Sequence, residues 1–408
     1  MKLRTIKEIK DLKGKRVLLR VNFNVPLLNG KVADDSRIKA ALPTIEYLLA
    51  RGAKIILVSH LGRPKGVDKK YSLAPVAKRL EKLLGRKIKL VERKEVGGNI
   101  VMLENVRFNL GEEKNDSKFA KELAGLADIY VNDAFPDSHR AHASIVGVTK
   151  YLPSYAGLRL EQEVSVLSAL LKKPKKPFVA LIGGAKIFDK IGAIKNLSEK
   201  AGKILLGGAL ANNFLKAMGY EVGASLVEVE GVKLAKSLLK NKKIILPLDV
   251  VVGMKDGKKA MVVDIARLSS REVQIIKQSS SLLHKILRFA RGSNLNVICK
   301  KPLAILDIGP KTILEYAKQL KKAKTLIWNG PMGLYEVKQF SHGTMALGRL
   351  FASRSKGLAY GVAGGGETID ALDKTGLAEY VDWISMGGGA MLEFLEGKNL
   401  PGIKVLMK

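Results

Sequence analysis

Short apolar runs rich in Val, Ile and Leu alternate with amphipathic stretches along the whole chain. A run that is apolar throughout, rather than at every second residue, predicts a strand buried on both faces. Such strands form parallel sheets covered by helices, so the pattern predicts an α/β fold. The predicted strands include residues 16–21, 55–58, 100–103 and 129–131 in the first half, and residues 178–182, 204–206, 304–306 and 326–328 in the second.

The length of the chain, 408 residues, exceeds what a single hydrophobic core usually supports, so we expect two domains. Between the two halves, residues 158–171 carry an apolar stripe at helical spacing, and the basic segment Lys172–Lys176 follows, with a proline inside it. This pattern predicts a helix that ends near the basic segment. The predicted fold is therefore two doubly wound, Rossmann-like parallel-sheet domains joined by an interdomain helix.

The composition is that of a globular protein, with 47% hydrophobic and 27% charged residues. No apolar run approaches the ~18 residues needed to cross a bilayer, and the N-terminus lacks the apolar centre of a signal peptide. The single cysteine, Cys299, excludes an internal disulfide framework and a cysteine-based zinc site. We therefore expect a cytoplasmic protein without a membrane span.

The formal net charge of +33 is unusually high. Such a bias is typical of proteins that bind nucleic acid or an anionic membrane. Here the lysines lie in short scattered groups that are not interleaved with aromatic residues, which make up only 6% of the chain. A solvated, lysine-rich surface is the favoured interpretation, and nucleic acid is a partner that we do not favour.

In the first half, polar and basic residues follow one predicted strand after another. The loops after the strands hold the ligand in open parallel sheets. A lone arginine in such a loop more often forms a surface salt bridge, but the planar fork of arginine also suits carboxylate and phosphate oxygens. The repetition predicts a site for a small molecule with several negative charges. The residues are Asn22, Asn24 and Arg37, then His60 and Arg63, then Arg107, and then Arg140.

In the second half, glycines follow the strands. They occur in Gly183-Gly184, Gly207-Gly208, Asn329-Gly330-Pro331 and Gly364-Gly365-Gly366. Glycine turns let backbone N–H groups approach phosphate oxygens, although any one cluster can instead serve a tight turn and close helix–sheet packing. Together the clusters favour a phosphate-rich ligand, even though neither a Walker A sequence nor Gly-x-Gly-x-x-Gly is present. Glu367 is a suitable carboxylate for a magnesium ion held mainly by nucleotide phosphates.

These motifs together resemble the phosphoglycerate kinase family, in order from Val17 to Pro401. The resemblance implies reversible phosphoryl transfer between 1,3-bisphosphoglycerate and ADP, giving 3-phosphoglycerate and ATP, in glycolysis and gluconeogenesis, with Mg²⁺. It implies a phosphoglycerate-binding domain at residues 1–157 with a returning segment 387–408, an interdomain helix at 158–173 and a nucleotide-binding domain at 174–386. The two domains would close about a hinge, and we expect a monomer. The matching segments are residues 18–26, 60–66, 104–108, 132–135, 139–142, 182–186, 328–333, 365–368, 387–390 and 395–398.

The resemblance also implies roles for individual residues. Arg37 and Lys186 would be catalytic, because they would stabilise the moving phosphoryl group, and Glu336 would accept hydrogen bonds from the ribose. The residues implied to bind the phosphoglycerate are Asn22, Phe23, Asn24, Arg37, His60, Leu61, Gly62, Arg63, Arg107 and Arg140. Those implied to bind ATP or ADP are Gly183, Gly184, Lys186, Lys190, Gly207, Gly208, Asn329, Pro331, Glu336, Gly364, Gly365, Gly366, Glu367 and Thr368, with Glu367 also binding the magnesium ion.

Three residues depart from the usual pattern of that family. Asn22 and Glu367 each stand where aspartate is usual, and Met386 stands where threonine is usual near the hinge. Asparagine keeps a hydrogen-bonding carbonyl but lacks the negative charge. We therefore expect the contacts to the substrate hydroxyl to differ, while the reaction class stays the same.

The stretch between Val263 and Leu306 is longer than the resemblance leads us to expect, with a basic insertion around residues 264–303. Within it, residues 271–277 and 282–290 have the pattern of a basic amphipathic helix, which could dock a partner, an acidic membrane or RNA. An added helix that packs on its own domain is the favoured interpretation. A nucleic-acid-binding protein with an inherited enzyme fold and a kinase for a related acid are the alternative hypotheses. The joint presence of Arg37, Lys186 and Glu367 favours the phosphoglycerate kinase.

Overall fold

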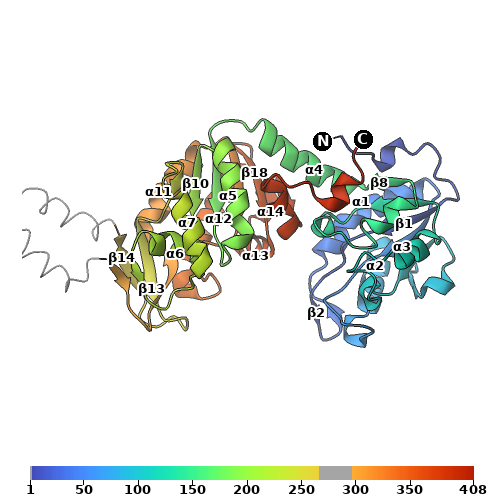
Figure 1. The fold of residues 1–408 in the computed structure, drawn as a ribbon, viewed down its shortest axis with the longest axis horizontal. Coiled ribbons are helices and arrows are strands. Elements are labelled where there is room, and N and C mark those ends of the chain that lie inside the picture. The colour runs from blue at the N-terminus through green and yellow to red at the C-terminus, as the bar shows by residue number, and fades with distance from the viewer. Residues whose placement is uncertain (1, 266–295) are drawn as a thin grey trace, which may run out of the picture. The chain divides into compact units, whose positions relative to one another are not determined.

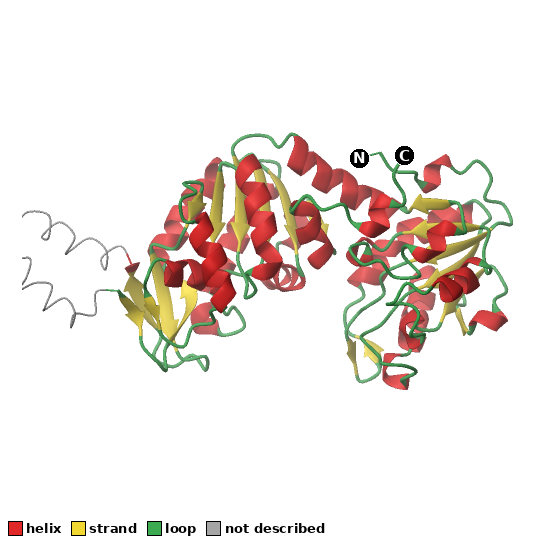
Figure 2. Cartoon of the chain, viewed as in Figure 1, coloured by secondary structure: helices red, strands yellow, loops and turns green. Residues whose placement is uncertain are grey.

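The computed structural model describes residues 2–265 and 296–408 (Figure 1). They form two compact units, each built of strands and helices (Figure 2). Unit 1 runs up to Ala169 and includes Gly389–Phe394 and Lys398–Lys408, whereas unit 2 consists of Leu170–Gly388 and Leu395–Gly397. Helix α4 (Leu158–Lys172) leads from the first unit into the second. The predicted amphipathic helix at residues 271–290 lies outside the described residues.

The main sheet of unit 1 has six parallel strands in the order β5-β6-β4-β1-β7-β8. The strands are β1 (Arg16–Arg20), β4 (Lys54–Val58), β5 (Lys89–Val91), β6 (Ile100–Leu103), β7 (Ile129–Asn132) and β8 (Ser154–Ala156). A hairpin is formed by β2 (Leu27–Leu28) and β3 (Lys31–Val32). The helices are α1 (Ser36–Ala50), α2 (Ala74–Leu84), α3 (Ser117–Ala124), α14 (Gly389–Leu395) and α15 (Pro401–Lys404).

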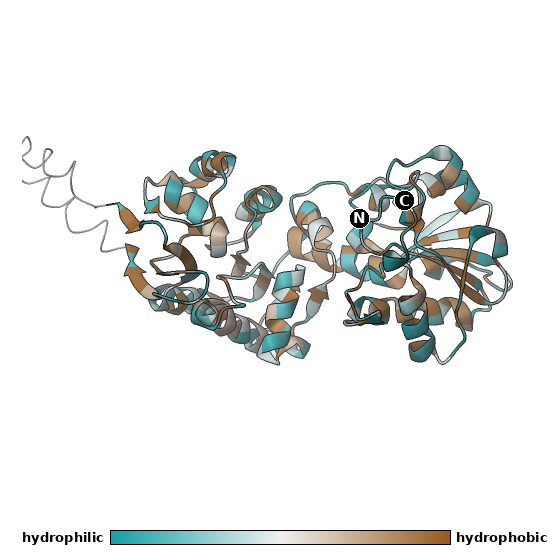
Figure 3. Ribbon diagram, turned by 90° about the horizontal axis from the view of Figure 1, so that it is seen from below, coloured by the Kyte–Doolittle hydropathy of each residue, from teal (hydrophilic) through white to brown (hydrophobic). Residues whose placement is uncertain are grey.

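Strand β1 is buried on both faces, as its unbroken apolar run predicts. Figure 3, in which the ribbon is coloured by hydropathy, shows that many strands of both units are hydrophobic. Leu19 belongs to the core that includes residues of α1 and α2, whereas Leu18 belongs to the core that includes residues of α3. In the register of the sheet, Arg20 pairs with Val58 of β4 and with Asn132 of β7. The carboxyl ends of these three strands therefore lie at one level, and the loops that follow them emerge at one edge.

The two ends of the chain lie side by side in unit 1. The N–H of Arg4 donates to the carbonyl of Leu406 at 2.9 Å, and Leu3 forms an antiparallel bridge with Met407. The C-terminal segment thus returns to the unit in which the chain begins.

The main sheet of unit 2 also has six parallel strands, in the order β12-β10-β9-β17-β18-β19. Ile182 pairs with Leu206 and with Asn329, so here too the glycine-containing loops emerge together. The strands are β9 (Phe178–Ile182), β10 (Lys203–Leu206), β12 (Ile244–Ile245), β17 (Thr325–Asn329), β18 (Tyr360–Gly364) and β19 (Trp383–Ser385). The helices are α5 (Phe188–Lys200), α6 (Gly208–Ala217), α7 (Val229–Leu238), α11 (Pro310–Lys322), α12 (His342–Ser355) and α13 (Gly366–Thr375).

Unit 2 also contains a small antiparallel sheet that the sequence did not lead us to expect. Its strands are β14 (Met261–Asp264), β13 (Asp249–Gly253) and β16 (Ala304–Ile308), and a further parallel pair is β11 (Glu221–Val222) with β15 (Val297–Cys299). The run at residues 304–306 is therefore a strand, but placing it in a parallel sheet was wrong. Ile305 packs in one core with Leu215 of α6, and a short buried run does not distinguish the two kinds of sheet.

In the part of the chain that the structure describes, no helix combines the length and the apolar content needed to cross a membrane.

Candidate active site

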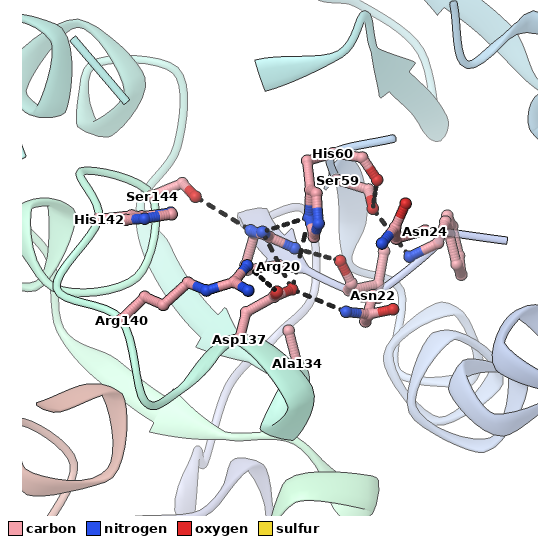
Figure 4. A network of polar contacts seen from close by, with 12 residues as sticks. Arg20, Asn22, Asn24, Ser59, His60, Ala134, Asp137, Arg140, His142 and Ser144 are labelled. Carbon is pink, nitrogen blue, oxygen red and sulfur yellow. Dashed lines mark hydrogen bonds and ion pairs between the residues drawn. The ribbon is translucent and has the colours of Figure 1, made fainter. Parts of the chain in front are cut away.

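The buried carboxylate of Asp137 lies at the centre of the polar cluster in unit 1 (Figure 4). Its Oδ2 accepts a hydrogen bond from Asn22 Nδ2 at 2.9 Å and lies 3.2 Å from a terminal guanidinium nitrogen of Arg20. Its Oδ1 lies 3.7 Å from Arg140, and His60 Nδ1 lies 3.6 Å from Oδ2. The loops that follow β1, β4 and β7 thus converge on one carboxylate. This is expected, because the carboxyl ends of these three strands lie side by side in the sheet.

The charge state of Asp137 follows from these neighbours. Burial alone would raise its pKa, but the positive charges of Arg20 and Arg140 and the hydrogen bond from Asn22 together hold the pKa below its ordinary value. Asp137 is therefore an anion at neutral pH, and it balances part of the positive charge of the cluster.

His60 is neutral and has a defined tautomer. Burial, with the positive charges of Arg20, Arg107 and Arg140, lowers its pKa to about 3 against the attraction of Asp137. A nitrogen of Arg20 lies 3.1 Å from His60 Nδ1, and arginine can only donate. Nδ1 is therefore the acceptor, and the ring proton is on Nε2, where it can be donated to an anionic ligand.

Arg37 is positioned by the loop that follows β1. It donates to the carbonyl of Asn24 at 2.6 Å and to Asn22 Oδ1 at 3.3 Å. Asn24 Oδ1 in turn accepts from the N–H of Gly62 at 2.8 Å, which ties this loop to the loop after β4. Gly62 has φ +64°, and a Cβ there would overlap the ring of Tyr71, so the turn requires glycine.

The remaining arginines of unit 1 have different surroundings. Arg107 is buried, donates to the carbonyl of Gly62 at 2.6 Å and lies 3.0 Å from Glu113. Arg63 is exposed, and its side chain forms no hydrogen bond or ion pair with the described residues. Arg140 keeps 30% of its side chain exposed. Arg63 and Arg140 are thus the guanidinium groups that are most available to a ligand.

Two residues of the implied substrate set do not present side chains. Phe23 and Leu61 are 0% and 4% exposed and belong to the core beside α1 and α2. The N–H of Phe23 donates to Ser59 Oγ at 2.9 Å. Their contribution to a site is therefore to fix the course of the two loops.

The sequence-based site did not include Arg20, Asp137, Ser144 or Glu112. Arg20 is 1% exposed and donates to Ser144 Oγ at 3.0 Å, and Ser144 donates to Glu112 Oε1 at 2.6 Å. Burial raises the pKa of Glu112, which is 0% exposed. A charged residue at the end of an apolar strand, as Arg20 is, was the available signal. Nothing local in the sequence distinguishes Glu112 from a surface carboxylate.

In unit 2, a cavity of ≈ 240 Å³ lies beside the glycine loops. Gly184, Gly208 and Pro331 line it at the strand ends, Glu336 and Glu367 line it with carboxylates, and apolar side chains such as Ile305 supply further wall. Glycine loops next to apolar walls suit a ligand with a phosphate chain at one end and a flat apolar group at the other.

Most of these glycines pack backbone against backbone. The N–H groups of Gly183 and Gly184 donate to the carbonyls of Asn329 and Pro331 at 2.9 and 2.7 Å. Those of Gly207 and Gly208 donate to Ile182 and Met332 at 3.1 and 2.7 Å. These four N–H groups are thus used within the protein, which supports the close-packing alternative for these glycines rather than direct contact with phosphate.

The N-terminus of α13 is different. Within the described residues, the N–H groups of Gly366, Glu367 and Thr368 have no protein acceptor, as expected for a first helical turn. The preceding Gly365 has φ +101°, and Gly364 offers its carbonyl to Asn329 Nδ2 at 2.7 Å. The hydroxyl of Thr368 is buried and accepts from the N–H of Gly330 at 2.7 Å. This helix end is therefore the strongest candidate for phosphate.

The two lysines of the implied nucleotide set are placed differently. Lys190 is 8% exposed and donates to Asn329 Oδ1 at 2.7 Å. Burial lowers its pKa to about 8, against the attraction of Glu367 and Asp189. Lys186 is exposed. Lys190 thus stabilises the loop after β17, whereas Lys186 can reach a ligand.

A magnesium ion fits this edge through one protein carboxylate. Glu367 is exposed at the start of α13, and a Cβ on Gly184 would lie 3.6 Å from its Oε2. The described residues contain no group of three His, Cys, Asp or Glu side chains that could hold a metal by themselves. One carboxylate together with ligand phosphates is the usual arrangement for Mg²⁺.

A family model described as phosphoglycerate kinase matches residues 6–398. The chain is similar to the phosphoglycerate kinase of Pelotomaculum thermopropionicum, with 44% identity over 426 aligned residues that cover 100% of both chains. It is 46% identical to that of Moorella thermoacetica, with 98% of each chain covered. Among solved structures it is similar to the phosphoglycerate kinase of Coxiella burnetii, with 40% identity, a TM-score of 0.81, and 99% of this chain and 98% of the other covered.

Proposed function

The chain belongs to the phosphoglycerate kinase family, and from this premise we propose which residues bind the two substrates and stabilise the transferred phosphoryl group. Members transfer a phosphoryl group reversibly between ATP and the carboxyl group of 3-phosphoglycerate, a reaction of glycolysis. The observation that supports the assignment most strongly is the contrast between the carboxyl edges of the two main sheets. One gathers arginines around a neutral histidine, and the other combines glycine loops with a free helix N-terminus.

The anionic substrate binds on unit 1 in this proposal. Arg63, Arg107 and Arg140 hold its phosphate and carboxylate oxygens, since charge-assisted bonds from arginine are strong and directional. The Nε2–H of His60 donates to the same ligand. Asn22 and Asn24 lie beside Arg37 and contact the hydroxyl end of the substrate.

The nucleotide binds on unit 2. Its base lies in the cavity of ≈ 240 Å³, Glu336 accepts from the ribose hydroxyls, and the β- and γ-phosphates lie at the N-terminus of α13. Glu367 holds the magnesium ion, which when bound would neutralise charge on the phosphate oxygens. Lys186 reaches the transferred group, and Lys190 keeps Asn329 in place.

The chemistry requires positioning rather than proton transfer. A carboxylate oxygen of 3-phosphoglycerate attacks the γ-phosphorus, and the bond from that phosphorus to the bridging oxygen breaks as ADP leaves with the electron pair. No proton moves between heavy atoms, so the reaction requires no general base, and a neutral His60 fits it. Arg37 and Lys186 stabilise the charge that develops on the phosphoryl oxygens.

Because the two ligand sets belong to different units, transfer requires closure of the units on each other, which also excludes water from the reacting groups. We further propose a monomer, since the two units of one chain together supply the whole residue set. We also propose a location in the cytoplasm, as the composition of the sequence leads us to expect.

An assay that couples formation of 1,3-bisphosphoglycerate to NADH oxidation tests the function. With 3-phosphoglycerate, ATP and Mg²⁺ present we expect turnover, and omitting any one component should abolish it. Absence of turnover with all components present, together with tight RNA binding, would favour the nucleic-acid-binding alternative instead.

A further inference from the structure

Asn22 lies between a cation and an anion. Its Oδ1 accepts from Arg37 at 3.3 Å. Its Nδ2 donates to Asp137 at 2.9 Å (Figure 4). Both Asn22 and Asp137 are nearly closed to water, with 8% and 3% of their surface exposed. The amide therefore connects the arginine proposed to stabilise the transferred group with the carboxylate at the centre of the cluster.

The chemistry of the two neighbours decides which side chain fits at position 22. A side chain that donates on one side and accepts on the other satisfies both, and asparagine does this. An ionised aspartate would accept from Arg37 but would place a second negative charge at hydrogen-bond distance from Asp137. Two carboxylates that share a buried site cannot both ionise freely. The asparagine, which stands where aspartate is usual in the family, is thus the residue that Asp137 requires.

Asp137 in turn supplies the negative charge of this part of the site. It is the carboxylate in contact with Arg20, Arg140 and Asn22. Among the nearby carboxylates, Glu112 binds Ser144 and Glu113 lies against Arg107. If Asp137 lost its charge, the buried guanidinium of Arg20 would lose its ion-pair partner, which is costly.

We propose that Asn22 and Asp137 act as one functional pair. The carboxylate of Asp137 carries the negative charge of the site, and the Asn22 amide, which is hydrogen-bonded to both Asp137 and Arg37, couples that charge to the position of Arg37. This inference rests on the proposed function, and it deepens that function by adding Asp137 as a positioning residue. Neither member of the pair transfers a proton or a group.

A charge swap tests the pair. We expect Asp137→Asn to lower kcat with 3-phosphoglycerate about 10- to 100-fold and Asn22→Asp to lower it at least ~10-fold, whereas the double variant Asn22→Asp/Asp137→Asn recovers to within about 5-fold of the wild type. Asn24→Asp/Asp137→Asn has the same net charge, but the contacts of Asn24 are with Arg37 and Gly62 rather than with Asp137, so it should not recover. A swap variant no faster than the slower single variant would overturn the proposal.

A second measurement needs only the Asn22→Asp variant to fold. When protonated, the carboxyl group introduced in this variant can donate to Asp137 as the amide does, and the neighbouring carboxylate favours its protonation. The ratio of kcat for this variant to kcat for the wild type should therefore rise at least ~5-fold from about pH 8 to about pH 5.5. A ratio that does not change with pH contradicts the proposal.

The proposed function and the pairing of Asn22 with Asp137 can be refuted separately. A wild-type chain without turnover of 3-phosphoglycerate and ATP would refute the proposed function. Normal wild-type turnover combined with no rescue by the swap and a flat pH ratio would refute only the pairing of Asn22 with Asp137.

Discussion

Replacing Arg37 with alanine should separate turnover from binding. The side chain donates to the Asn24 carbonyl and to Asn22 Oδ1, at 2.6 and 3.3 Å, through one terminal nitrogen. Arginine has five N–H donors, so its remaining donors are available to the transferred group. Its two protein contacts join a charged donor to neutral acceptors, and losing each should lower the free energy of unfolding by about 1.5–3 kcal/mol at most.

The larger loss concerns the transition state. Removing a donor aimed at developing charge typically costs ~2.7–4 kcal/mol, which corresponds to a decrease of about 10²–10³-fold in kcat. We expect the KM for 3-phosphoglycerate to change by less than about 3-fold, because Arg63, Arg107 and Arg140 remain in place. Arg37→Lys keeps a charge without the fork and should recover only part of the rate.

Steady-state kinetics in both directions, with saturating second substrate, provide the test. Thermal unfolding of Arg37→Ala serves as a control for folding, and the midpoint should fall by only a few degrees, so that the variant is folded at the assay temperature. An unchanged kcat, or a large increase in KM at unchanged kcat, would refute the role of Arg37 in the transition state.

Three other changes have definite expected outcomes. Glu367→Gln should raise the Mg²⁺ concentration for half-maximal turnover about 10-fold, because it removes the only protein charge proposed for the ion, and chelation of Mg²⁺ should stop turnover. Gly157→Ala places a Cβ that overlaps the carboxyl group of Asp133, so the free energy of unfolding should fall by about 1–3 kcal/mol in denaturant titration. Burial raises the pKa of Asp133 to about 7, so its contribution to stability should be lost as pH rises from about 4 to 7. Asp133→Asn should therefore gain stability relative to the wild type over that range, by up to about 4 kcal/mol, because the pKa of Asp133 is raised from 3.8 to about 7.

Each of these outcomes has a control. A Mg²⁺ dependence unchanged in Glu367→Gln contradicts the metal assignment, and the KM for 3-phosphoglycerate should stay constant in that variant. Gly97→Ala meets no atom within 4 Å and should change stability by less than about 0.5 kcal/mol; equal effects at both glycines would contradict the packing argument. A stability difference between Asp133→Asn and the wild type that is the same at about pH 4 and about pH 8 would show that Asp133 titrates normally.

The central strands of the two main sheets could be predicted from the sequence, whereas the strands at their edges, β5 and β8 in unit 1 and β12 and β19 in unit 2, are not among the predicted runs. An unbroken apolar run such as that of β1 predicts both a strand and its burial on both faces. Because neighbouring strands are parallel and in register, the loops that follow them lie close together. The antiparallel sheet of β13, β14 and β16 could not be predicted, because short buried runs do not reveal their partners.

The same limit applies to the site. His60 lies in the loop after β4 and Arg37 in the first turn of α1. Both follow predicted strands, where ligands are expected in a parallel sheet, so their positions are informative in the sequence alone. The contact between Asn22 and Asp137 joins residues 115 positions apart, and only the folded chain shows it. For the glycine loops the sequence leaves two alternatives, phosphate contact and close packing. The structure shows that Gly183 and Gly208 use their N–H groups within the protein.

The central claim is that the anionic substrate and the nucleotide bind to separate residue sets on the two units. Measuring both Michaelis constants for Arg140→Ala and for Glu336→Gln tests it most directly. We expect Arg140→Ala to raise the KM for 3-phosphoglycerate about 10-fold or more and to leave that for ATP within about 2-fold, and Glu336→Gln to do the reverse. If both constants rose together in each variant, or if neither rose, the assignment of the two sites would be wrong.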